Sequence, residues 1–60
     1  MNIRNSTDNQ FAELMGDATD ADARVMREML IELGFEDTND VPDPLWDDLL
    51  IAVAEATAAA

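Results

Sequence analysis

Apolar side chains recur three or four residues apart in three segments of this chain, and this spacing places them on one face of a helix. The clearest segment runs from Val25 to Leu33, and another runs from Trp46 to Val53. No stretch of any length shows the strict alternation of apolar and polar residues that a half-buried strand needs. We therefore expect an all-α fold.

The first segment predicts a short helix between Thr7 and Gly16. Thr7 is followed three residues later by Gln10, the spacing of a capping box with Thr7 as N-cap. Gly16 ends the segment because glycine readily adopts the left-handed backbone found after a helix. The apolar face of this helix is formed by Phe11, Leu14 and Met15.

The second segment predicts a helix near residues 20–33. Thr19 is a favourable N-cap, and acidic side chains follow in the first turn, where the helix dipole favours negative charge. Gly34 and then Phe35 predict a glycine C-cap closed by a hydrophobic contact. The apolar stripe consists of Val25, Met26, Met29, Leu30 and Leu33.

The third helix is predicted to begin at a proline-rich boundary. Asp43 is a strong N-cap, and Pro44 suits the first helical position because the N–H that proline lacks has no helical partner there. Pro42 restricts the residue before it to extended backbone and so separates this helix from the preceding chain. The stripe that follows consists of Trp46, Leu49, Leu50, Val53 and Ala54.

These segments predict a single domain, residues 1–60, folded as a small three-helix bundle with a short first helix and two longer antiparallel helices. Residues 36–42 form the one substantial connection. A helical hairpin that dimerises into a four-helix bundle is an alternative, so we expect a monomer or a homodimer. The expected core residues are Phe11, Leu14, Met15, Val25, Met26, Met29, Leu30, Leu33, Phe35, Trp46, Leu49, Leu50 and Val53.

The side chains that the sequence lacks argue against most chemistry. The chain has no Cys and no His, which excludes disulfides and the usual zinc and transition-metal sites. No general base stands near Ser6, and no glycine-rich phosphate loop is present. We therefore expect no catalytic residues, no metal and no cofactor, and we do not expect an enzyme.

The charge balance is extreme for so short a chain. Fourteen acidic residues face three Arg and no Lys, for a formal net charge of −11. Such a charge disfavours direct binding to nucleic acid or to an anionic membrane and favours a basic protein as partner. A purely solubilising role for the acids is the competing interpretation. We expect a cytoplasmic protein, because the first residues carry no secretory signal pattern.

The densest acidic stretch is "EDTNDVPDPLWDDLL", residues 36–50, which contains no basic residue. Carboxylates four residues apart on a helix lie about 6 Å apart along its axis, a spacing of the same order as that of phosphates along a nucleic-acid strand. The residues expected to bind a partner are Asp37, Asp40, Asp43, Asp47 and Asp48, with Glu28 and Glu32 as a second patch.

In size, acidity and helical content the chain resembles small phage-encoded inhibitors, such as the nucleic-acid-mimicking anti-CRISPR proteins. The resemblance covers the whole chain and contains no specific motif. It implies a decoy that occupies the basic surface of a partner protein, such as a nucleic-acid-binding effector.

Trp46 supports two interpretations. One places it in the core against Met29 and Leu33, and the other places it at the edge of the bundle as an anchor for a partner. The second belongs to an alternative function, a helical interaction module that binds through an apolar groove or a homodimer seam, with the acids serving solubility.

Arg24 is expected to form ion pairs along its own helix with Asp20 and Glu28, each four residues away.

The charge generates the first testable prediction. Repulsion among the carboxylates opposes the compact state and is screened by salt, so the melting temperature should rise between about 0.01 M and about 0.15 M NaCl. Melting curves followed by circular dichroism at the two salt concentrations measure the change. A lower melting temperature at the higher salt concentration would contradict the prediction.

Overall fold

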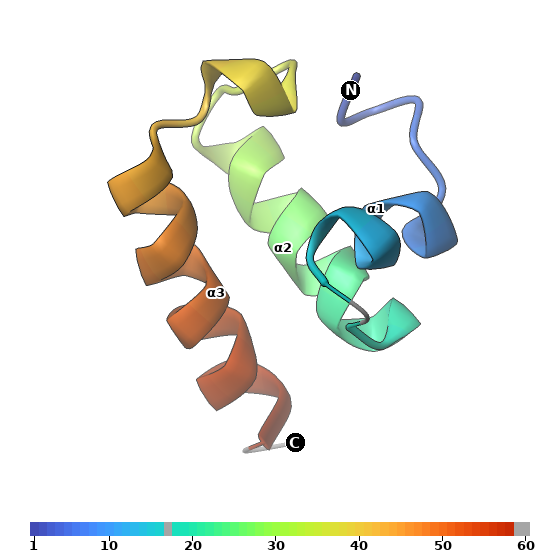
Figure 1. Cartoon of the computed structure of the whole chain (residues 1–60), viewed down its shortest axis with the longest axis vertical. Coiled ribbons are helices and arrows are strands. Elements are labelled where there is room, and N and C mark those ends of the chain that lie inside the picture. Colours follow the sequence, from blue (N-terminus) through green and yellow to red (C-terminus); the bar gives the residue numbers. More distant parts are fainter. Residues whose placement is uncertain (17, 59–60) are drawn as a thin grey trace.

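The computed structural model describes residues 1–16 and 18–58, and over these residues the chain forms the predicted three-helix bundle (Figure 1). Helices α2 and α3 lie antiparallel to each other, and the short α1 packs on α2 (Figure 1). A single turn of 3₁₀ helix, η1, interrupts the connection between α2 and α3. The elements are α1 (Asp8–Leu14), α2 (Asp20–Glu32), η1 (Thr38–Asp40) and α3 (Asp43–Ala58).

The start of α1 is the predicted capping box. The backbone N–H of Gln10 donates to Thr7 Oγ1 at 3.1 Å, and the backbone N–H of Thr7 donates to Gln10 Oε1 at 3.1 Å. Two backbone donors that the first helical turn leaves free are thereby satisfied. The helix is followed by Gly16 with φ of 87°, the left-handed conformation expected after its end.

Helix α2 also has the predicted ends. Thr19 Oγ1 accepts from the N–H of Asp22 at 3.1 Å. Gly34 has φ of 91°, its N–H donates to the Ile31 carbonyl, and the N–H of Phe35 donates to the Leu30 carbonyl, both at 3.0 Å. This pair of bonds is a Schellman motif, which reverses the chain direction at the end of the helix.

Helix α3 begins one residue earlier than predicted. The carbonyl of Pro42 accepts from the N–H of Trp46 at 2.9 Å and so takes the first helical hydrogen bond. Asp43 is consequently the first residue of the helix and not its N-cap. Its carboxylate still lies at the positive end of the helix dipole, where negative charge is favourable.

The core lies between α2 and its two neighbours. Ala23, Met26 and Leu30 of α2 are buried at 0% exposure. Two residues predicted for the core, Leu14 and Leu33, are instead 48% and 56% exposed. Both stand at the C-terminal ends of their helices, where the helical spacing continues but no neighbouring element covers the side chain. The buried apolar residues are Ile3, Phe11, Ala12, Ala23, Met26, Leu30, Val41, Leu49 and Val53.

The N-terminal segment contributes a core residue that the sequence pattern did not reveal. Ile3 is fully buried, and its N–H donates to the Glu36 carbonyl at 2.9 Å. The N–H of Thr38 donates to the Met1 carbonyl at 3.0 Å. These bonds hold residues 1–3 beside the connection that follows α2, and Ile3 closes this end of the core.

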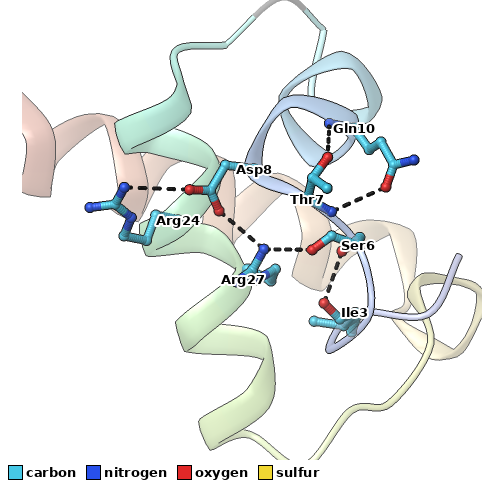
Figure 2. A network of polar contacts seen from close by, with 7 residues as sticks. All are labelled: Ile3, Ser6, Thr7, Asp8, Gln10, Arg24 and Arg27. Carbon is cyan, nitrogen blue, oxygen red and sulfur yellow. Dashed lines mark hydrogen bonds and ion pairs between the residues drawn. The ribbon is translucent and has the colours of Figure 1, made fainter.

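A polar network fastens α1 and the N-terminal segment to α2 (Figure 2). The carboxylate of Asp8 pairs with Arg27 at 3.0 Å and with Arg24 at 3.4 Å. Arg27 also donates to the Ser6 carbonyl at 2.7 Å, and the buried Ser6 hydroxyl donates to the Ile3 carbonyl at 2.8 Å. The pairs predicted for Arg24 along its own helix are therefore replaced by a pair between helices.

Ile3 and Ile51 provide a matched test of this architecture, because Ile3 is buried and Ile51 is 60% exposed. Truncation of the buried side chain in Ile3→Ala should lower the free energy of unfolding by about 2–5 kcal/mol, since it leaves a cavity. The control Ile51→Ala should change it by no more than about 0.5 kcal/mol. Urea denaturation measures both, and equal effects of the two substitutions would show that residues 1–3 do not complete the core.

Candidate functional site

A shallow, open hollow lies where the end of α1, the turn η1 and the start of α3 meet. Its volume is about 210 Å³. Ligand pockets for small molecules usually measure about 300–1,000 Å³, so this hollow fits one large side chain better than a substrate. The hollow is lined by Leu14, Thr38, Asn39, Val41, Asp43 and Trp46.

Trp46 forms the aromatic wall of the hollow. It is half-buried, and its ring lies 6.0 Å from that of Phe11, centroid to centroid, at an interplanar angle of 47°. A tilted pair at this distance is a favourable aromatic arrangement. The indole thus packs in part against the core, as the first interpretation predicted, while Leu33, one of its two predicted neighbours, is 56% exposed. The residue also remains partly exposed to solvent, as an anchor requires.

Three of the predicted binding acids belong to this end of the molecule. Asp43 lines the hollow, and Asp47 lies four residues further along α3, on the same face of the helix as Asp43. Asp40 ends η1, between the lining residues Asn39 and Val41. All three carboxylates are exposed, and none forms an ion pair with another described residue. We call these three residues the rim of the hollow: Asp43 lines it, and Asp40 and Asp47 each adjoin a lining residue in the chain.

The other predicted acids do not join this rim. Asp48 lies two residues after Trp46, about 160° around α3 from it at 100° per residue, and so is directed away from the side of the helix that carries Trp46. Glu28 and Glu32 are exposed on the side of α2 opposite Met26 and Leu30. The structure thus divides the predicted acidic surface into the rim of the hollow and separate groups on α2 and α3.

Asp37 takes part in the fold. Its Oδ1 accepts from the N–H of Asn39 at 2.9 Å and from the amino group of Met1 at 3.1 Å. The Asn39 N–H, and secondarily the Met1 amino group, hold the pKa of the Asp37 carboxyl below its ordinary value. This carboxylate is therefore already paired inside the molecule, unlike those on the rim.

Four residues of the hollow were not predicted as site residues: Leu14, Thr38, Asn39 and Val41. One local signal for η1 was available, because an Asp that precedes Thr-Asn-Asp can accept from the backbone two residues on and nucleate a turn. Val41 was the one apolar residue inside a polar connection, and it is 7% exposed. The position of Leu14 at the hollow depends on how α1 packs and has no local signal.

The lining of the hollow is chemically mixed. It combines an indole face, alkyl surface from Leu14 and an exposed carboxylate. Within residues 1–16 and 18–58, no three acidic side chains come close enough together to hold a metal ion. Over the same residues, the helices are too short or too polar to cross a membrane.

Comparison with known proteins adds no further identification. No protein-family model, no curated protein and no solved structure matches this chain.

The contacts of Asp37 predict a pH-dependent contribution to stability. Because its pKa is lower in the folded state than the ordinary value of 3.8, the stabilisation is complete above that pH and disappears as the pH falls below it. Asp37→Asn keeps an acceptor oxygen but removes the charge. We expect the wild type to melt at a higher temperature than this variant at neutral pH, and the difference to shrink progressively as the pH falls through and below 3.8.

Differential scanning calorimetry of the two proteins over this pH range measures the difference directly. Both proteins share the other carboxylates, so the effect of protonating these groups cancels in the difference between the two melting temperatures. A difference that stays constant with pH would show that the charge of Asp37 is not what its contacts stabilise.

Proposed function

We propose that this protein is a small acidic inhibitor that binds a basic, nucleic-acid-handling surface of another protein and occupies it in place of nucleic acid. The observation that supports this most is the group of exposed carboxylates on the rim of the hollow, Asp40, Asp43 and Asp47, which have no cationic partner among the described residues. Both arginines of α2 are directed to Asp8 instead. The rim carboxylates can therefore bind cationic groups of a partner.

The spacing of these carboxylates suits a surface built for phosphates. Asp43 and Asp47 are held four residues apart on a continuous helix, about 6 Å along its axis. Docking would neutralise basic side chains on the partner and would weaken as salt rises. A decoy of this type is what the likeness to nucleic-acid-mimicking anti-CRISPR proteins implies. It acts in the cytoplasm, without catalysis and without a cofactor.

A second candidate function is an interaction module that binds through apolar contact. The half-buried Trp46 and the 48% exposed Leu14 in one hollow support it. Such binding shows a negative heat-capacity change and little dependence on salt. The rim acids would then serve solubility, and a second copy of the chain could be the partner.

Capture experiments distinguish the two candidates. The full chain is immobilised and exposed to a nuclease-treated lysate of the source cells, and bound protein is then challenged with duplex DNA or structured RNA. We expect nucleic acid to displace the partner, and the affinity of the purified pair to fall steeply as salt rises. A partner that neither nucleic acid nor salt displaces would contradict the proposal and favour the apolar module.

A charge-matched pair of variants locates the surface. The triple substitution Asp40→Asn, Asp43→Asn and Asp47→Asn should weaken binding about threefold to a hundredfold, if each lost ion pair contributes about 0.2–1 kcal/mol. The control neutralises three other exposed acids, in Glu13→Gln, Asp20→Asn and Glu55→Gln. It carries the same net charge and should bind almost as tightly as the wild type. Equal losses in both variants would show that total charge, and not the rim, determines binding.

A further inference from the structure

The hollow combines three features that match the parts of one kind of side chain. Trp46 offers an aromatic face, Leu14 offers alkyl surface, and Asp43 offers an exposed carboxylate. Thr38 and Asn39 add polar groups to the wall. Its volume of about 210 Å³ suits a single extended side chain.

We propose that this hollow receives one arginine side chain of the protein partner. The proposal rests on the proposed function and specifies the contact at its centre. The planar guanidinium stacks on the Trp46 indole and donates to the Asp43 carboxylate, and the alkyl stem packs against Leu14. Arginine suits the site better than lysine because its guanidinium is planar and more weakly hydrated, so it loses less on leaving water for an aromatic surface.

Charge complementarity excludes the other occupants. An acidic side chain or a phosphate would be repelled by Asp43 and by Asp40 and Asp47, which are close to it in the sequence. The net charge of −11 on the chain adds to this repulsion. A purely apolar side chain would fill the hollow but would shield Asp43 from water without giving it a partner, which is unfavourable. Only a cationic side chain with an apolar stem satisfies the indole, the alkyl wall and the carboxylate together.

The test uses the full chain labelled with ¹⁵N, in which the single Trp gives one indole N–H signal in the NMR spectrum. The probe is the capped tripeptide acetyl-Gly-Arg-Gly-amide. Its matched controls carry citrulline, which has the same shape without the charge, or leucine. We expect the arginine peptide to shift the Trp46 indole signal together with the amide signals of Leu14 and Asn39. The citrulline and leucine peptides should bind about two- to fivefold more weakly or not at all.

Variants of two exposed acids extend the test. Asp43→Asn should lower the affinity for the arginine peptide about two- to fivefold, to the level of the citrulline peptide. Asp20→Asn, at the start of α2, should leave it unchanged. The comparison of peptides on the wild-type chain remains decisive even if a variant is less stable.

Three results would overturn the inference. Equal binding of the leucine or citrulline peptide would make the hollow a neutral subsite. Shifts spread over the acidic residues without the Trp46 signal would mean non-specific ion binding. Shifts at Trp46 that depend on the concentration of the chain, without any peptide, would identify the occupant as a second copy. Failure of the proposed function gives a different result. In that case the captured partner is displaced by neither nucleic acid nor salt, while the arginine peptide still binds the hollow.

Discussion

The burial of one face of α2 is the interaction on which the rest of the structure depends. Ala23, Met26 and Leu30 are fully buried, and α1 and α3 each pack against this helix. Contact between α1 and α3 is made by side chains such as Phe11 and Trp46, whose rings meet at the core. The hollow lies where the end of α1, the turn η1 and the start of α3 come together.

Charge is divided between the fold and the candidate site. With three arginines for fourteen acids, most carboxylates have no possible cationic partner in the chain. Two of the arginines meet at Asp8, where they join α1 to α2, and the Met1 amino group binds Asp37 beside η1. The acids near the hollow are thus left facing solvent by the same contacts that stabilise the bundle. This arrangement connects the stability of the fold to the negative rim from which we infer a basic partner.

Local patterns predicted much of the fold. The Thr7 and Thr19 caps, the positive φ angles of Gly16 and Gly34 and the approximate bounds of all three helices follow from short stretches of chain. The burial of Ile3 was not predicted, because it depends on a hydrogen bond to Glu36, far along the sequence. The exposure of Leu14 and Leu33 was also missed, since helical spacing identifies a face but not what covers it.

For the candidate site, the sequence by itself determined the excess of carboxylates, the position of Trp46 among them and the absence of Cys and His. It also determined where the helices begin and end, because caps and glycine turns depend on residues only a few positions apart. Only the tertiary structure decided which carboxylates are paired and that Leu14, Val41 and Trp46 line one hollow. These outcomes require contacts between residues distant in the chain, and such contacts arise only when the helices pack.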